Sequence, residues 1–188
     1  MSKEKFKEIV EADQYRIYGS KGTKGKLINF LRNPGFKYLY IMRKCNFYKD
    51  KNKLFYRFYY LILLHYQYKF GLEIPPQTKI GKGFYIAHIG AITINPNAVI
   101  GENVNILTGA LIGYNPRGKY KGCPTIGNEV WIGPNSVIVG NIKVGNNVVV
   151  APNTLVNRDV PDNSMVIGNP AQIIPNKNAT ESYINYTV

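Results

Sequence analysis

Two side chains suited to group transfer stand out in this chain of 188 residues, which has two histidines and two cysteines. The imidazole of His88 belongs to a class that titrates near neutral pH and accepts a proton from a hydroxyl within hydrogen-bond distance. The thiol of Cys123 lies near Lys121, and positive charge of this kind favours a nucleophilic thiolate. Both residues lie beside an interruption in a regular aliphatic pattern. We therefore expect the chemistry at these two interruptions.

The aliphatic pattern has a period of six residues and runs from position 74 to position 156. It is interrupted by a step of 8 residues between Ile86 and Ile94 and by a step of 14 between Ile112 and Ile126. Each step leaves two residues over after whole hexads. Helices repeat near 3.6 residues and strands at 2. A sustained period of six therefore predicts a solenoid of short strands and turns, whose stacked rungs form one aliphatic column.

Glycine follows the aliphatic residue of many hexads, where a tight corner favours a residue without a Cβ. These positions are Gly81, Gly101, Gly113, Gly127, Gly133 and Gly145. The pattern predicts an all-β solenoid over residues 72–174, followed by a loose tail over 175–188 that has little aliphatic content.

The basic character of the chain belongs to its N-terminal segment. Residues 1–71 hold 16 Lys and Arg against 5 Asp and Glu, whereas residues 72–188 hold 8 against 6. We expect helices over 3–13, 24–33, 35–46 and 52–69, rich in aromatic residues. No recognition motif accompanies the charge, so we expect no nucleic-acid partner. Two alternatives stay open: a helical cap on the first rung or on another subunit, and peripheral docking to anionic lipid.

The remaining composition indicates a cytoplasmic protein, at the inner face of the membrane if the basic segment docks there. The opening residues are charged and no apolar signal region follows them. The longest apolar stretch, Phe58 to Leu64, is far shorter than the roughly 20 residues that cross a bilayer. Two cysteines and two histidines give no paired metal-ligand spacing, so we expect reduced thiols and no metal.

An ordered set of short motifs runs through the solenoid segment: Lys79-Ile80-Gly81-Lys82-Gly83, Ile86-Ala87-His88-Ile89-Gly90, Pro124-Thr125-Ile126-Gly127, Trp131-Ile132-Gly133 and Val166-Ile167-Gly168-Asn169-Pro170-Ala171. With them the segment from Glu73 to Ile174 resembles the hexapeptide-repeat acyltransferases, most closely the serine acetyltransferase branch. The resemblance implies a left-handed parallel β-helix, acetyl-CoA as co-substrate and a homotrimer whose sites lie between chains.

The resemblance also implies catalytic roles. A histidine at the position of His88 acts as general base and takes the proton from the acceptor hydroxyl as it attacks the thioester. The serine enzymes have an Asp where this chain has Glu73, and a carboxylate there orients the imidazole and stabilises the imidazolium. Glu73 is thus the candidate orienting acid, with a solvated carboxylate at the solenoid entrance as the alternative.

Two departures from the serine enzymes concern the acceptor. Ala87 replaces an Asp, and Gly122-Cys123 replaces an Arg-His pair before Pro124. The missing charged groups recognise the ammonium and carboxylate of serine, so their loss favours an acceptor without a zwitterion, such as a saccharide. Cys123 would then line the acceptor pocket, with a nucleophilic thiol as the alternative. Two basic residues of the 114–124 loop, Arg117 and Lys119, are candidates to contact CoA phosphates or an acidic glycan.

Acetyl-CoA would lie along a groove between neighbouring solenoids. By the resemblance, backbone groups line its pantetheine arm, two basic side chains contact its phosphates and the C-terminal motif lies near its nucleotide; the residues are Gly113, Gly133, Pro134, Ala151, Pro152, Lys143, Arg158 and Pro170. For each glycine alone, corner geometry is the alternative explanation.

Together these features predict an acetyl-CoA-dependent O-acetyltransferase that acts on a saccharide of a capsule, exopolysaccharide or lipopolysaccharide precursor. Serine O-acetylation and N-acetylation of an amino sugar remain alternatives within the enzyme class. A non-catalytic β-helix scaffold docked at the membrane is the alternative from another class.

Overall fold

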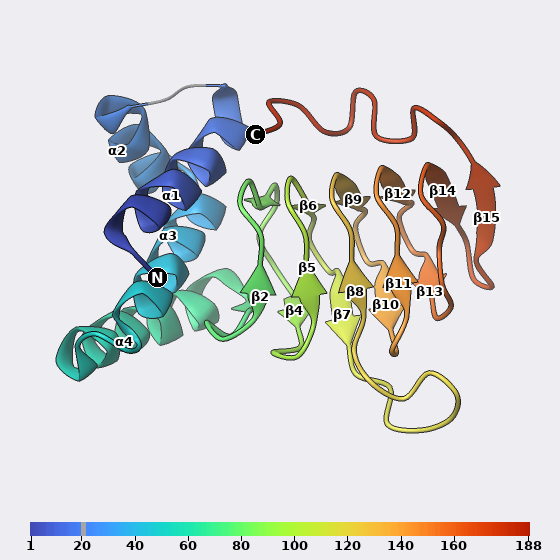
Figure 1. The fold of residues 1–188 in the computed structure, drawn as a ribbon, viewed down its shortest axis with the longest axis horizontal. Coiled ribbons are helices and arrows are strands. Elements are labelled where there is room, and N and C mark those ends of the chain that lie inside the picture. The colour runs from blue at the N-terminus through green and yellow to red at the C-terminus, as the bar shows by residue number, and fades with distance from the viewer. Residues whose placement is uncertain (20–21) are drawn as a thin grey trace.

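A helical segment and a β-solenoid lie end to end in the computed structural model, which describes residues 1–19 and 22–188 (Figure 1). The helices are α1 (Lys3–Tyr18), α2 (Thr23–Arg32), α3 (Pro34–Tyr48) and α4 (Lys53–Phe70). Asn33 and Asn52 cap α3 and α4 by accepting hydrogen bonds from backbone N–H groups of the first turn. Gly71 ends α4 at a φ of 63°, in the left-handed region that glycine adopts at little cost.

The solenoid has three faces, and each is a sheet whose strands come from successive coils. Sheet A contains β1 (Leu72–Glu73), β4 (Ile92–Ile94), β7 (Leu111–Gly113), β10 (Val137–Val139) and β13 (Leu155–Val156). Sheet B contains β2 (Lys79–Ile80), β5 (Val99–Ile100), β8 (Thr125–Ile126) and β11 (Lys143–Val144). Sheet C contains β3 (Tyr85–Ile86), β6 (Asn105–Ile106), β9 (Val130–Ile132), β12 (Val148–Val150), β14 (Ser164–Ile167) and β15 (Gln172–Pro175).

Strand pairing explains the two interruptions of the hexad pattern. Undisturbed coils pair residues 18 apart, as in Ile94 with Ile112, which is three hexads. Leu72 pairs with Ile92, so the first interruption adds two residues to its coil. Leu111 pairs with Val137, 26 positions on, so the second adds eight. The predicted surplus of two residues is thus right for the first interruption and wrong for the second, whose step of 14 crosses a single corner.

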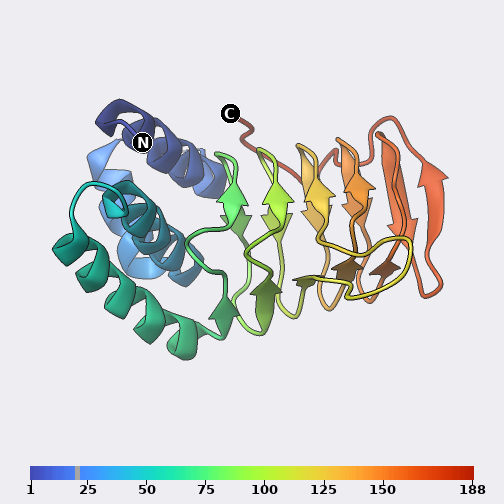
Figure 2. The same cartoon turned by 60° about the horizontal axis from the view of Figure 1, so that its bottom comes forward.

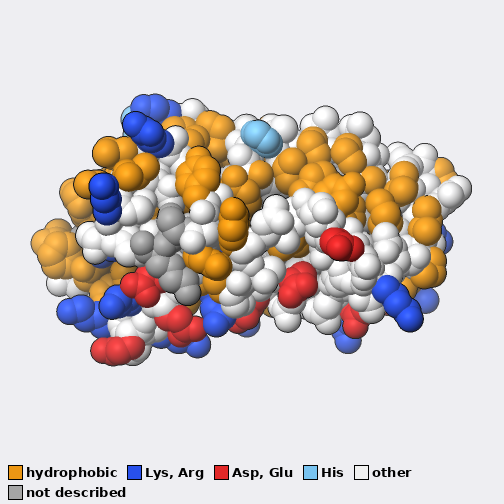
Figure 3. All heavy atoms as spheres, turned by 90° about the horizontal axis from the view of Figure 1, so that it is seen from above, with side chains coloured by type: hydrophobic (Ala, Val, Ile, Leu, Met, Phe, Trp, Pro, Cys, Tyr) orange, Lys and Arg blue, Asp and Glu red, His pale blue; other side chains and the backbone are white. Residues whose placement is uncertain are grey.

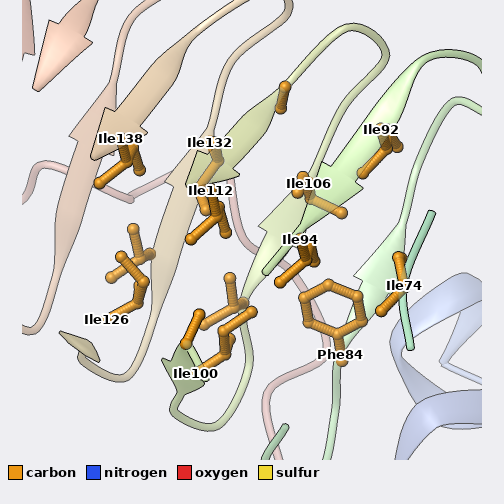
Figure 4. Close-up of a cluster of buried hydrophobic side chains, with 14 of the residues drawn as sticks. Ile74, Phe84, Ile92, Ile94, Ile100, Ile106, Ile112, Ile126, Ile132 and Ile138 are labelled. Atoms are coloured by element: carbon orange, nitrogen blue, oxygen red, sulfur yellow. The ribbon is translucent and has the colours of Figure 1, made fainter. Parts of the chain in front are cut away.

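The period of six produces the predicted aliphatic column. Ile92, Ile106, Ile112 and Ile132 are at most 1% exposed, and their side chains point into the space between the three sheets (Figure 4). Full burial of such a side chain contributes about 1.5–3 kcal/mol. The chain forms the predicted left-handed parallel β-helix with an α-helical N-terminal segment.

Several corner glycines are required by close approach between coils. A Cβ on Gly81 would lie 2.5 Å from the carbonyl oxygen of Gly101, and one on Gly101 would lie 2.5 Å from that of Gly127. The same stacking continues from Gly127 to Gly145 at 2.6 Å. These glycines form a column along the corner after sheet B, where the backbone of the next coil occupies the place of a side chain.

The Gly101→Ala variant is expected to lower the free energy of unfolding by about 1–3 kcal/mol, because its Cβ would press on a backbone carbonyl that cannot move alone. Gly113→Ala is the matched control, since its Cβ would meet the movable side chains of Leu111 and Val139. Urea unfolding of both variants measures the difference. Equal losses would contradict the role assigned to the stacked backbone.

Helix α3 covers the open end of the solenoid at the first coil. Tyr38, Leu39 and Met42 are buried in the same hydrophobic cluster as Ile74 and Ile86. The hydroxyl of Tyr38 donates to the carbonyl of Ile74 at 3.0 Å, and burial raises the pKa of Tyr38 to about 12, so the hydroxyl keeps its proton. The predicted packing of the helical segment on the first rung is confirmed.

The C-terminal segment differs from the expected loose tail. It runs back along the outside of sheet C toward the helical end (Figure 1). The backbone N–H of Val188 donates to Oδ1 of Asn103, and Nδ2 of Asn103 donates to the backbone carbonyl of Val188, both at 3.0 Å. Asn105 donates to the backbone carbonyl of Tyr183. The ring centroids of Tyr183 and Trp131 lie 5.0 Å apart. Side-chain amides hold this tail in place. The aliphatic pattern therefore does not predict its position.

Candidate functional site

His88 lies in the corner between β3 and β4, where the two extra residues of the first coil are accommodated. The next coil holds both sides of this corner. Ala87 donates its backbone N–H to Ile106, and the carbonyl of Gly90 accepts from the Thr108 hydroxyl at 2.9 Å. The imidazole itself is exposed and makes no hydrogen bond within the described ranges. The corner therefore presents a free imidazole on a fixed backbone.

Thr108 is not among the predicted site residues, although its hydroxyl helps to fix the histidine corner. Its signal in the sequence is positional. Once the first coil is known to have 20 residues, Thr108 falls one coil above His88. The aliphatic period alone does not mark it.

The corner that carries His88 continues in later coils as one edge of the solenoid, between sheets C and A. We call it the histidine edge. The third coil contributes Gly133 and Pro134, and the fourth contributes Ala151 and Pro152. Hydrogen bonds join these corners, as from the N–H of Asn153 to the carbonyl of Pro134 at 3.0 Å. The structure thus aligns four of the predicted CoA-binding residues with the predicted base.

Two of the predicted CoA-binding residues use their backbone N–H groups within the solenoid. The N–H of Gly133 donates to Val150, and that of Ala151 donates to Val166, both at 2.9 Å. These inter-coil bonds build the solenoid itself. A pantetheine arm on this edge would therefore meet half-buried Pro134, exposed Pro152 and backbone carbonyl groups. Its binding here stays a prediction.

The opposite margin of sheet A carries the second group of predicted residues. Gly113 ends β7, and the loop of residues 114–124 follows and projects from the solenoid (Figures 1 and 2). Reciprocal backbone bonds of 2.9 and 3.0 Å between Asn115 and Gly122 close its base. Arg117 and Lys119 are exposed in the part of the loop that projects. We call this margin the loop edge.

Cys123 lies at the foot of this loop and is unsuited to nucleophilic attack. Its Sγ is 3.2 Å from Oδ1 of Asn95, to which the thiol donates. Burial raises the pKa of Cys123, which is opposite to the shift that a nucleophilic thiol needs. Both observations disfavour the alternative of a thiolate nucleophile, and the pocket-lining role of Cys123 stays a prediction. Asn95, which the sequence did not single out, fixes this side chain.

Glu73 points outward from β1, the first strand of sheet A, and is exposed. It pairs in register with Thr93, five residues beyond His88. No ion pair joins Glu73 to His88 among the residues that the structure describes. Its orienting role stays a prediction, because both side chains face solvent in the single chain.

The two predicted phosphate ligands lie apart, and only Arg158 is near Pro170. Arg158 donates to the carbonyl of Ala171, which brings its guanidinium beside the exposed Pro170. Lys143 is exposed at the start of β11 in sheet B and belongs to neither edge. No group of His, Cys, Asp and Glu in residues 1–19 and 22–188 is arranged to hold a metal ion.

Sheet A separates the two edges and presents an apolar outer face. Leu111, Val137 and Leu155 point outward from it and are half-buried. Sheet C, by contrast, is covered by the C-terminal tail. His88 and Cys123 therefore lie on opposite sides of sheet A, and one chain does not bring them together.

Comparison with known proteins assigns the family. A family model described as bacterial transferase hexapeptide (six repeats) matches residues 123–158. The chain is 46% identical over 108 residues to serine acetyltransferase 1 of Arabidopsis thaliana, covering 57% of this chain and 34% of the relative. It is 43% identical over 104 residues to WcaB of Escherichia coli K12, named for colanic acid biosynthesis, covering 55% of this chain and 64% of WcaB.

Solved structures extend the likeness to the helical segment. The serine acetyltransferase of Neisseria gonorrhoeae, solved with serine, matches with a TM-score of 0.75 and 30% identity over 92% of this chain and 70% of that one. The chain spans about a third of the length of the plant relatives that it matches. With its solenoid, motifs and these matches, the chain belongs to the hexapeptide-repeat transferase family.

Proposed function

We propose that this chain is an acetyl-CoA-dependent O-acetyltransferase that acts on a saccharide hydroxyl, with His88 as the general base. The observation that carries the proposal is the exposed imidazole at the head of the histidine edge, which has no hydrogen-bond partner among the residues that the structure describes. A structural histidine would be packed or bonded. A fixed backbone with a free side chain suits a group that must meet two substrates.

The reaction needs two proton transfers, one to the imidazole of His88 and one from it. The imidazole of His88 takes the proton of the acceptor hydroxyl, and the oxygen attacks the thioester carbonyl carbon. The C–S bond then breaks, and the imidazolium returns the proton to the departing CoA thiolate. The products are an acetyl ester and CoA with a free thiol. Glu73, on the neighbouring strand, is the candidate for holding the imidazole in the required tautomer.

A homotrimer with shared sites is part of this proposal. The two predicted groups of side chains lie on opposite sides of sheet A, so a complete site needs the histidine edge of one protomer and the loop edge of another. The apolar outer face of sheet A lies between them and is the surface that such an assembly would bury. Arg117 and Lys119 would then approach the substrates from the neighbouring chain.

The acceptor is proposed to be a saccharide because two positions that carry polar or charged groups in the serine enzymes hold Ala87 and Cys123 here. Ala87 carries no charge, and Cys123 is held as a neutral thiol by burial and by Asn95. The relatives include both serine acetyltransferases and a protein named for colanic acid biosynthesis. Serine O-acetylation is the second candidate, favoured by the solved structures, and N-acetylation of an amino sugar is the third.

Acceptor specificity is tested by release of CoA thiol from acetyl-CoA with L-serine and with a panel of sugars and oligosaccharides. The parent chain is expected to turn over with a saccharide and to leave serine almost unchanged. NMR of the product distinguishes an ester from an amide. Faster turnover with serine than with any sugar would overturn the saccharide proposal. If acetyl-CoA neither reacts nor raises the melting temperature, the scaffold alternative gains the support instead.

The Ala87→Asp/Cys123→His double variant restores two polar groups that the serine enzymes have at these positions. Its kcat/KM for serine is expected to rise by about tenfold or more, because each bond to a charged group contributes about 1.5–3 kcal/mol. The same double variant with His88→Ala serves as the control and should show no gain. An unchanged rate with serine would mean that these two positions do not determine the acceptor.

A further inference from the structure

An apolar stripe on the outer side of α4 has no partner within the described part of the chain. Leu54, Phe58, Leu61 and Tyr68 are 76, 55, 66 and 83% exposed. Their spacing of four, three and seven residues places them on one face of a helix. The opposite face of α4 packs inward, where the ring of Tyr59 stacks on α3. Helix α4 is therefore apolar on both sides, and only one is covered.

The position of α4 leaves this stripe accessible. Helix α4 lies at the outer margin of the helical segment, with α3 between it and α1 (Figure 2). On α2, Leu27 and Leu31 are likewise 60% and 64% exposed. Hydrophobic side chains lie open at this end of the molecule, where Lys, Arg, Asp and Glu side chains are also exposed (Figure 3). The helical end thus combines exposed apolar groups with positive charge.

The charge around the stripe is of one sign. Between residues 23 and 70 the chain has eleven Lys or Arg and a single acidic residue, Asp50. On a helical wheel of about 100° per residue, Arg57 and Lys69 lie about 60° to either side of Leu54. Both side chains are exposed. Basic residues therefore border the apolar stripe on both sides.

We propose that α4 docks this protein on an anionic lipid surface, with the stripe of Leu54, Phe58, Leu61 and Tyr68 buried at the boundary between headgroups and acyl chains. A second copy of the chain is a less favourable partner, because two identical cationic surfaces would face and repel each other. An anionic bilayer accepts both features, because its headgroups attract Arg57 and Lys69 while its interface buries aromatic and aliphatic groups.

The contact is peripheral and does not depend on the proposed activity. Among the described residues no helix combines the length and the hydropathy needed to cross a bilayer. Helix α4 leads directly into β1, so docking through it would hold the first coils of the solenoid, including the His88 corner, close to the lipid surface. An acceptor carried on a lipid would then be met at that surface.

The test is flotation of the full chain with vesicles of phosphatidylcholine alone or mixed with phosphatidylglycerol, at physiological ionic strength. The parent is expected to float with the mixed vesicles and not with phosphatidylcholine alone. Phe58→Ser/Leu61→Ser should lower the partition coefficient by about tenfold or more. Arg57→Gln/Lys69→Gln should lower it by about 30-fold, since each basic residue near the surface contributes about 1 kcal/mol.

Matched controls use exposed residues of the same types elsewhere. Ile174→Ser lies on β15, and Lys79→Gln/Lys177→Gln removes two exposed charges outside the helical segment. These variants should float like the parent. Unchanged melting temperatures show that the α4 variants stay folded, since the altered side chains face solvent.

Four results would overturn the proposal. The first is that the parent stays in the unbound fraction when phosphatidylglycerol is present, and the second is that the α4 variants and the controls float equally. The third is that the parent binds no vesicles and that Phe58→Ser/Leu61→Ser loses self-association, measured by light scattering. This result would assign the stripe to contact with a second copy. Binding of the parent to RNA but not to vesicles would likewise replace lipid by nucleic acid.

Discussion

The His88→Ala variant is expected to lower the rate of acetyl transfer by about 10²–10⁴, which is the usual contribution of a general base. Without the imidazole, the acceptor hydroxyl must lose its proton to water as it attacks the thioester. The fold should be unaffected, because the side chain is exposed and the corner is held by the backbone of Ala87 and Gly90. Thiol release at saturating acetyl-CoA, with the acceptor that reacts with the parent, measures the effect.

His65 supplies the matched control, since it is the other histidine of the chain and is also exposed. His65→Ala should transfer acetyl at the parental rate, and both variants should melt at the parental temperature. A His88→Ala enzyme that keeps most of its activity would show that another group takes the proton. Loss of acetyl-CoA binding along with turnover would instead assign His88 to binding.

The Asp13→Ala variant is expected to lose about 3–5 kcal/mol of unfolding free energy, because it leaves a buried guanidinium without its counter-ion. Nε of Arg43 lies 3.0 Å from Oδ2 of Asp13, and their side chains are 5% and 2% exposed. The Asp13 carboxylate also accepts from the N–H of Phe84 at 3.1 Å. This pair joins α1 and α3 to the first coil, where Arg43 donates to the carbonyls of Ile80 and Gly81. Urea unfolding measures the loss.

An exposed ion pair between the same two parts of the molecule is the control. Glu8 of α1 and Lys82 of the first coil also lie 3.0 Å apart, but both reach solvent. Glu8→Ala should unfold at the parental midpoint, since exposed pairs contribute little. Asp13→Asn should lie between Asp13→Ala and the parent, because an amide oxygen still accepts from Phe84. If Asp13→Ala and Glu8→Ala unfold alike, the buried pair does not hold the helical cap on the solenoid.

Much of the fold follows from local patterns. The period of six predicts which residues enter the core, because each hexad repeats the same short strand and corner; Ile92 and Ile106 are buried for this reason. The caps at Asn52 and Gly71 similarly reflect the conformations these residue types favour next to a helix. The prediction of His88 as the chemical centre came from its place at an interruption and from the family resemblance.

The arrangement of the site around sheet A was not visible in the sequence. Period and motif give the order of residues along the coil, but not which face or corner each one occupies. The extra eight residues of the third coil had to be placed before Cys123 could be assigned to the loop edge, opposite His88. Only the folded chain brings the Cys123 thiol within hydrogen-bond distance of Asn95.

The sequence by itself determined the solenoid, its aliphatic core, the basic helical segment and the candidate base, because each depends on a repeated local pattern or on a short motif. Only the tertiary structure decided the binding of the tail by Asn103 and Asn105, the buried pair of Asp13 and Arg43, and the uncovered stripe on α4. These features depend on contacts between residues far apart in the chain. Such contacts have no period, and they exist only once the coils are stacked and the helices cap them.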